Sequence, residues 1–147
     1  MKFVCKTIIN LPIIKVVELF MDKSSYKYWK KDFTGYEPIS GISEEAGSVT
    51  KLVFKRVTML ETITSKNLPA ELRCEYEHKQ GKKTVMFHNA SNRFNALTGN
   101  KTLYELDSVT TKAIGLLPKI MMLLMGKVAK KYAQIQLDQF KIFAEHK

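Results

Sequence analysis

A glutamate inside an apolar segment is the residue of this sequence best placed for acid–base chemistry. Glu61 shares one face of the alternating stretch VTMLETITSK with Met59 and Ile63. In an apolar environment a carboxyl group loses water, and this loss raises its pKa towards the range that a general acid or base requires. The alternative interpretation is an ion pair between Glu61 and a lysine near the edge of a sheet. Glu61 is the single catalytic candidate, and the catalytic residues are otherwise unknown.

Several other polar residues are candidates for acid–base or binding roles. In an enzyme, a tyrosine such as Tyr76 or Tyr104 would share proton transfer with this glutamate. Gln136 lies within the apolar arc of the last helix, where its amide either binds a ligand oxygen or reaches a backbone group. His78 lies near the turn KQGKK, and His88 alternates with an inward-facing phenylalanine. We therefore expect both imidazoles to be exposed to solvent.

The sequence lacks the motifs that mark the common enzyme classes. It contains no GxSxG elbow, no HExxH pair, no glycine-rich phosphate loop and no cysteines at zinc-binding spacing. Cys5 and Cys74 lie far apart, which favours reduced thiols and a cytoplasmic location. Lys6 and Asn10 interrupt the apolar run of the first residues, so we expect no leader peptide. We expect no metal and no cofactor.

The net charge of +10 arises from 24 basic and 14 acidic residues. Only Arg56, Arg73 and Arg93 are arginines, whereas nucleic-acid readers depend on arginine for bidentate contacts with phosphates and guanine. The lysines are scattered, and no basic patch alternates with exposed aromatic residues, so no nucleic-acid partner is expected. Two interpretations of the charge remain: a solvated surface, or attraction to an anionic ligand or an anionic membrane.

The apolar pattern predicts one domain, residues 1–147, that begins with a strand and two short helices. Residues 2–10 are rich in β-branched and aromatic residues, as in a strand, and residues 10–22 carry apolar residues at helical spacing. Residues 23–31 predict a second short helix or turn. From 32 to 109 the pattern changes to six strand segments separated by turns such as SEEAG and QGKK. The alternation in AELRCEYEHK is typical of an antiparallel sheet with one covered face.

The stretch AIGLLPKIMMLLMGKVAKKYAQIQLDQFKIF, residues 113–143, predicts one long C-terminal helix. Its apolar run covers residues 113–126 and contains Lys119, so it is shorter than the roughly 20 apolar residues of a membrane-spanning helix. The apolar residues form one broad face opposite lysines and glutamines, which favours a helix laid on a sheet. The methionines of this face are either core residues or the wall of a cavity for an apolar ligand.

Three motifs follow one another along the chain. The stretch INLPIIKVVELFMDKSSYKYWKKDFTGYEPISG combines a strand end, a proline, a Val-x-x-Leu-Phe helix and a tryptophan before the next strand. AGSVTKLVF places a Gly-Ser turn before a strand, and ETITSKNLPAELRCEYE joins a Glu-x-Ile strand to the next one through a proline turn. With these motifs the chain resembles the START-like, or SRPBCC, superfamily. That superfamily includes the major birch pollen allergen, START lipid-transfer domains, coenzyme-Q-binding proteins and polyketide cyclase/dehydrase-like proteins.

The resemblance implies an α+β helix-grip fold. In this fold a curved antiparallel sheet of about seven strands wraps around a long C-terminal helix, two short helices follow the first strand, and a cavity lies between sheet and helix. The tryptophan would stand at the cavity mouth, and strand alternation supplies the other walls. The residues expected to line the cavity are Trp29, Leu52, Phe54, Met59, Glu61, Leu72, Tyr76, Phe87, Tyr104, Met121, Met125, Tyr132 and Gln136. Each is alternatively plain core packing, and an error of one residue in a strand's register would invert its set.

The function that the resemblance implies is binding or transport of a hydrophobic or amphipathic small molecule, such as a lipid, a quinone or a polyketide-like compound. The alternative is a cyclase or dehydratase that acts on a polyketide-like substrate in the same cavity. The absence of enzyme motifs favours the binding protein, although the superfamily supports several chemistries. The expected partners are an apolar ligand and, at the periphery, an anionic membrane.

Overall fold

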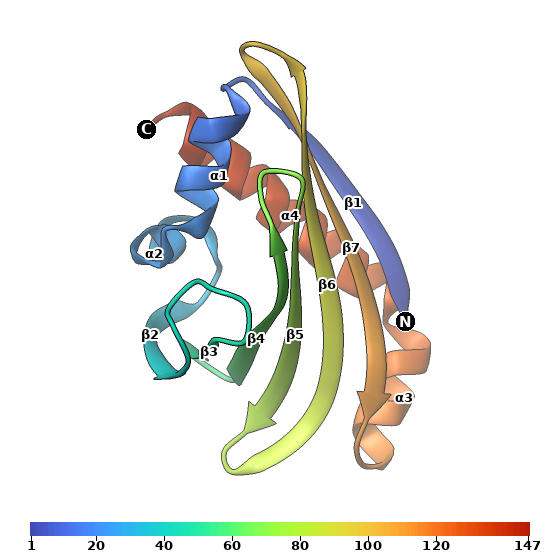
Figure 1. The fold of residues 1–147 in the computed structure, drawn as a ribbon. Coiled ribbons are helices and arrows are strands. Elements are labelled where there is room, and N and C mark those ends of the chain that lie inside the picture. The colour runs from blue at the N-terminus through green and yellow to red at the C-terminus, as the bar shows by residue number, and fades with distance from the viewer.

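The computed structural model describes residues 1–147, which form one curved antiparallel sheet with helices packed against it (Figure 1). The strands are β1 (Lys2–Ile9), β2 (Phe33–Ser40), β3 (Val49–Phe54), β4 (Thr58–Asn67), β5 (Glu71–Gln80), β6 (Lys83–Thr98) and β7 (Lys101–Ala113). The helices are α1 (Ile13–Met21), the 3-10 helix η1 (Lys23–Ser25), α2 (Tyr26–Trp29), α3 (Leu116–Leu124) and α4 (Gly126–Glu145). The strand order is β1-β7-β6-β5-β4-β3-β2. The expected α+β architecture, with a seven-stranded sheet and a long C-terminal helix, is confirmed.

β1 is an edge strand, and α4 covers its free side. Gln134 Nε2 donates to the Lys6 carbonyl oxygen at 2.9 Å, and Lys141 Nζ donates to the Ile8 carbonyl oxygen at 2.6 Å. An unpaired strand edge invites pairing with another chain, and side chains that occupy its carbonyl groups oppose this. The same two contacts hold α4 in place beside the sheet.

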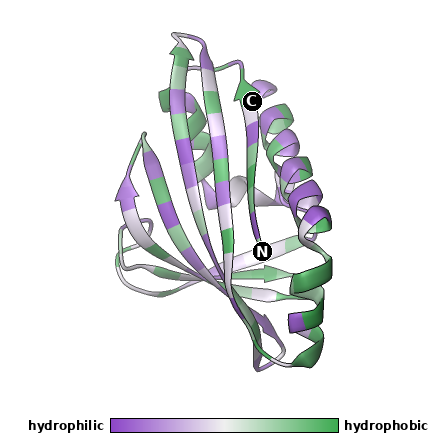
Figure 2. Cartoon of the chain, turned by 90° about the vertical axis from the view of Figure 1, so that its right-hand side faces the viewer, coloured by the Kyte–Doolittle hydropathy of each residue, from purple (hydrophilic) through white to green (hydrophobic).

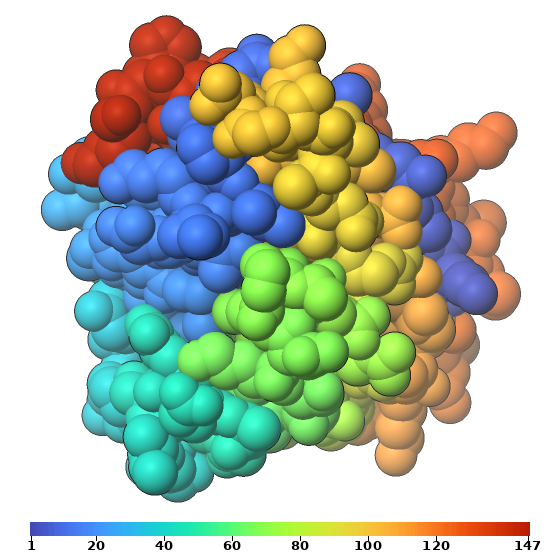
Figure 3. All heavy atoms as spheres, turned by 45° about the horizontal axis from the view of Figure 1, so that its top comes forward, coloured from blue at the N-terminus to red at the C-terminus, as the bar shows by residue number.

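An aromatic cluster fills one end of the space between sheet and helix. Phe140 of α4 is fully buried, and its ring centroid lies 4.8 Å from that of Trp29 and 5.7 Å from that of Phe20. Phe20 also packs against Phe94 and Tyr104 of the sheet, at 5.2 Å and 5.4 Å. Tilted and edge-on contacts of this kind stabilise a core beyond the area that they bury. Outside this end, α1 and the β4–β5 and β6–β7 turns form a continuous surface (Figure 3).

The single helix predicted for residues 113–143 is in fact two helices, α3 and α4, which meet at Met125. Met125 has φ −110° and ψ 19°, outside the helical range. It precedes Gly126, a residue of low helix propensity. Gly115 has a φ of 96°, a left-handed conformation that favours glycine, and it turns the chain from β7 into α3. The break at Met125 separates the methionine-rich helix α3 from α4, the helix that packs on the sheet.

α3 leaves most of its apolar side chains in contact with solvent. Leu116, Leu123 and Leu124 are 77%, 80% and 77% exposed, and no residue of α3 is buried. Figure 2 shows α3 as a helix that is apolar almost throughout. The prediction that the methionine-rich segment is part of one helix packed on the sheet is therefore wrong, because the chain breaks at Met125 and no residue of α3 is buried. None of the helices combines the length and apolar composition needed to cross a membrane.

Candidate functional site

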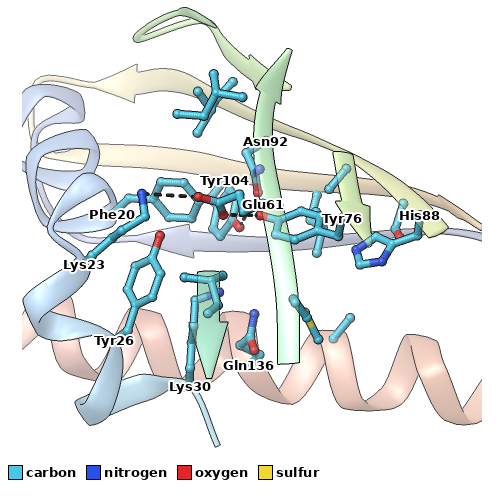
Figure 4. Close-up of a pocket in the computed structure, with 18 of the residues that line it drawn as sticks. Phe20, Lys23, Tyr26, Lys30, Glu61, Tyr76, His88, Asn92, Tyr104 and Gln136 are labelled. Atoms are coloured by element: carbon cyan, nitrogen blue, oxygen red, sulfur yellow. Dashed lines mark hydrogen bonds and ion pairs between the residues drawn. The ribbon is translucent and has the colours of Figure 1, made fainter. Parts of the chain in front are cut away.

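A cavity of about 240 Å³ lies between the sheet and the helices α1, α2 and α4. The sheet contributes side chains from β1 and from β3 to β7, and α4 contributes Tyr132, Ala133 and Gln136. Apolar side chains make up most of the lining. The polar side chains labelled in Figure 4 are Lys23, Tyr26, Lys30, Glu61, Tyr76, His88, Asn92, Tyr104 and Gln136. The cavity is thus apolar with a defined polar region.

Most of the residues expected at the cavity line it in the structure. They are Leu52, Phe54, Met59, Glu61, Leu72, Tyr76, Tyr104, Tyr132 and Gln136. Four expected residues lie elsewhere: Trp29, Phe87, Met121 and Met125. Strand alternation therefore identifies the inward faces of β3, β4, β5 and β7, and fails in β6.

The position predicted for Trp29, at the cavity mouth, is wrong. Only 4% of this residue is exposed, and its Nε1 donates to Ser25 Oγ at 3.2 Å. Its ring packs against Phe140 and Tyr26, with centroids 4.8 Å and 5.2 Å away. Trp29 anchors the short helix α2 against α4, and this packing keeps it out of the cavity.

Phe87 and His88 of β6 exchange the faces predicted for them. His88 is paired with Tyr76 of β5, and directly paired residues share a face, so both point into the cavity. Phe87 is paired with Glu77 and lies on the outer face. The prediction failed because the inward face of β6 carries polar side chains such as His88 and Asn92, and therefore lacks the apolar pattern of a covered face.

Met121 and Met125 lie in a second hollow, a groove of about 560 Å³ between α3, the start of α4 and the nearby strand ends. The methionines that line it are Met1, Met86, Met121, Met122 and Met125. Their flexible side chains adapt to irregular apolar shapes. Tyr132 lines both the groove and the cavity, so the two hollows meet at this residue.

Glu61 is buried and forms an ion pair. Lys23 Nζ lies 3.2 Å from Glu61 Oε1, and the Tyr76 hydroxyl donates to Oε2 at 2.7 Å. The side chains of Lys23 and Glu61 are 7% and 5% exposed, so their charges interact with little screening by water. Both interpretations of Glu61 hold in part, since it faces the interior and pairs with a lysine. That lysine belongs to η1 rather than to a sheet edge, and nothing in the polar stretch KSSYKYWKK indicates its burial.

Lys30, directly after α2, is a second cation at the cavity and has no carboxylate partner. Its ammonium lies 4.6 Å from the ring centroids of both Tyr26 and Trp29. None of the ion pairs of the protein includes it. Burial lowers the pKa of Lys30 to about 8, and the negative charge of Glu61 opposes this shift. Sequence reasoning missed this residue, because it stands beside an exposed lysine in a basic turn.

His78 and His88 form a close pair, and the prediction that both are exposed is wrong. The His88 ring stacks on Tyr76 with centroids 4.7 Å apart, and its Nδ1 lies 2.5 Å from Nε2 of His78. One nitrogen donates and the other accepts, which two neutral rings satisfy. Burial lowers the pKa of His78 to about 4. Burial and then the charge of His78 lower the pKa of His88 to about 3.

The remaining polar groups of the cavity are neutral hydrogen-bonding groups. Tyr104 Oη donates to Asn92 Oδ1 at 2.8 Å. Burial raises the pKa of Tyr76 and of Tyr104 well above the usual tyrosine value, so both hydroxyls stay protonated. Burial also raises the pKa of the Cys74 thiol to about 12, which removes its nucleophilic form near neutrality. No group of three or more His, Cys, Asp or Glu side chains is arranged to hold a metal ion.

No protein-family model matches the sequence, and no curated protein matches it. Solved structures do match its fold. A hypothetical protein of Helicobacter pylori has a TM-score of 0.76 at 12% identity, over 98% of this chain and 88% of that one. Ara h 8.0201 has a TM-score of 0.70 at 14% identity, over 100% and 99% of the two chains. The Zhui aromatase/cyclase from Streptomyces sp. R1128 has a TM-score of 0.68 at 16% identity, over 99% and 93%.

The chain has the START/SRPBCC-like helix-grip fold. The fold resemblance that the sequence motifs indicated is thereby confirmed. At these identities the likeness establishes the fold alone, since one fold carries many unrelated functions.

The buried ion pair predicts a strongly non-additive pair of substitutions. Lys23→Met leaves the Glu61 carboxylate buried without its cation, and we expect the free energy of unfolding to fall by about 3–5 kcal/mol. In the double variant Lys23→Met/Glu61→Leu, no buried charge remains unpaired, so most of this loss should be recovered. Denaturant unfolding measures both values. Lys15→Met, which removes an exposed pair with Glu18, is the control and should stay within about 0.5 kcal/mol. Additive losses would contradict the prediction.

The histidine pair predicts a loss of stability in mild acid. The ordinary histidine pKa is 6.5, and burial holds the folded values near 4 and 3, so below pH 6.5 the unfolded chain binds more protons. Stability is full above that pH and falls as the pH is lowered, by up to about 1.4 kcal/mol per pH unit for each ring. His88→Phe should flatten this fall in urea unfolding between about pH 6.5 and 5. His146→Gln, at the exposed C-terminus, should leave it unchanged, and equal slopes in all three proteins would refute the assignment.

Proposed function

We propose that this helix-grip protein binds and carries an amphipathic small molecule, such as a lipid, a quinone or a polyketide-like compound. The observation that carries the proposal is the meeting of two different hollows at Tyr132. The inner cavity contains the polar cluster around Glu61, and the outer groove is lined mainly by methionine and aliphatic side chains. A ligand with a polar head and an apolar body matches this division, with its head inside and its body towards α3.

The dimensions and surroundings of the two hollows support the proposal. Small-molecule sites commonly measure roughly 300–1,000 Å³ and combine apolar walls with a few polar groups. The cavity measures about 240 Å³ and the groove about 560 Å³, so a ligand of lipid size would occupy parts of both. We place the carrier in the cytoplasm, with residues 1–147 acting as one unit, because both cysteines are free and buried.

An enzyme of the cyclase or dehydratase type is the second candidate, and one contact favours it. The Tyr76 hydroxyl donates to Glu61, and such a pair can move a proton to or from a substrate carbon or oxygen. One solved structure of similar fold is named an aromatase/cyclase. However, Lys23 and Tyr76 already engage the Glu61 carboxylate, and the raised pKa of Tyr76 makes its phenolate unavailable near neutrality. The binding function is therefore favoured.

Native mass spectrometry of the freshly purified protein, followed by organic extraction, tests the two functions. We expect a stoichiometric hydrophobic species that is recovered unchanged. Ala133→Phe, which fills the cavity from α4, should abolish its retention, whereas Gln139→Phe on the exposed side of the same helix should not. The enzyme would instead be supported if the protein converts an added polyketide-like substrate and the Glu61→Gln variant does not. An empty protein that no lipid, quinone or aromatic compound stabilises against heating would overturn both.

We further propose that the carrier docks reversibly on anionic membranes through α3. Residues 108–137 include no aspartate or glutamate. The lysines of this segment are Lys112, Lys119, Lys127, Lys130 and Lys131, and none forms an ion pair. Anionic headgroups would complement the lysines, while the exposed leucines would enter the interfacial layer. Docking there would place the groove at the lipid surface, whereas a second copy of the chain would bring like charges together.

Vesicle flotation tests this docking. We expect binding to vesicles of phosphatidylcholine mixed with phosphatidylserine, weaker binding to phosphatidylcholine alone, and a further loss at high salt. Leu123→Glu/Leu124→Glu should abolish flotation, because it places charge on the inserted face. Ile42→Glu, at an equally exposed residue of the β2–β3 loop, is the control. If the protein does not float with vesicles and instead forms a dimer that the double substitution dissociates, the partner of α3 is a second copy of the chain rather than a membrane.

A further inference from the structure

The charges that line the cavity do not cancel. Two lysines and one glutamate, Lys23, Lys30 and Glu61, are its only aspartate, glutamate, lysine or arginine side chains. Lys23 and Glu61 neutralise each other at 3.2 Å, so one positive charge, that of Lys30, is left over. His88 adds none near neutrality, because burial keeps its pKa at about 3. The side chains that line the cavity therefore carry one net positive charge.

Lys30 is held at the cavity by aromatic side chains rather than by an anion. Its ammonium lies over the rings of Tyr26 and Trp29, both at 4.6 Å. Cation–π contacts of this kind offset part of the cost of removing a lysine from water. They leave the ammonium hydrogens without an acceptor, and an anionic acceptor would form the stronger, charge-assisted hydrogen bond.

Two further donors at the same cavity have no partner within the protein. The Tyr26 hydroxyl and the Gln136 amide line the cavity, and neither takes part in a side-chain hydrogen bond. Figure 4 shows Lys30 between these two side chains, on the α4 side of the cavity and apart from the Tyr104–Asn92 contact. The ammonium, the hydroxyl and the amide line the same cavity and provide several donors without a negative charge of their own, which suits a carboxylate.

We propose that the ligand of this cavity carries a carboxylate head, as a fatty acid does, and that Lys30 binds this head with the help of Tyr26 and Gln136. The inference rests on the proposed binding function and narrows its ligand class. Glu61 does not compete for the head, because Lys23 and Tyr76 already engage it.

Dodecanoic acid, its methyl ester and 1-dodecanol share one chain and differ in the head, so their affinities test the inference directly. By titration with the purified protein, we expect the acid to bind about tenfold or more tightly than the ester or the alcohol. Lys30→Met should abolish this preference, so that the acid and the ester bind with equal affinity. Lys27→Met, at an exposed position of the neighbouring helix α2, should keep this preference. Lys30→Gln provides a second variant in case the methionine perturbs folding, which circular dichroism reports.

The outcomes separate this inference from the function on which it rests. Equal affinity of the unmodified protein for acid and ester would overturn the carboxylate assignment and leave the binding function standing. An acid preference that survives in both Lys30 variants while folding is intact would overturn the assignment of Lys30 in the same way. If none of the three compounds binds and nothing apolar co-purifies, the binding function fails, and the assignment of Lys30 fails with it.

Discussion

The distribution of large and small side chains along α4 determines where the space between the sheet and this helix is filled and where a cavity remains. In the C-terminal half of α4, Leu137, Phe140 and Ala144 are buried and fill the space under the sheet together with α1 and α2. In the N-terminal half, Ala133 lines the cavity without filling it, and so does Gln136 at the middle of the helix. A curved sheet around a straight helix must be filled along its whole length or remain partly open. The cavity is therefore a consequence of the α4 sequence.

The polar cluster distinguishes this cavity from a packing defect. A buried ion pair such as that of Lys23 and Glu61 contributes little net stability, because desolvation consumes most of its Coulombic gain. Apolar residues of similar volume would hold the fold equally well, and the same holds for the half-buried ammonium of Lys30. Genuinely empty cavities in proteins are lined by apolar side chains. Charged and hydrogen-bonding groups in this one agree with a role in binding, which is the basis of the proposed function.

Sequence patterns predict the backbone of this protein better than its cavity. Strand alternation places Glu61, Tyr76 and Tyr104 on inward faces, because those strands mix apolar and polar residues with a strict period. It fails at Phe87, because the covered face of β6 is itself polar and only pairing with β5 reveals its direction. Lys23 and Lys30 could not be found from local pattern, since their burial depends on strands and a helix distant in sequence. The same limit applies to the break at Met125, where helical periodicity continues across a residue with non-helical dihedral angles.

The two ends of the site place different demands on a single ligand. At the outer end, the leucines of α3 remain in water, and each square ångström of such surface costs roughly 25 cal/mol relative to an apolar environment. At the inner end, an ammonium lacks an anion, and a ligand that supplies one would recover part of the desolvation cost. A neutral hydrocarbon would cover only the leucines, and a small acid would pair only with the ammonium. An amphiphile with an acidic head would do both. Both features concern the entry and holding of a ligand, and neither supplies a reacting group. For this reason they favour a carrier of fatty-acid-like molecules over a cyclase.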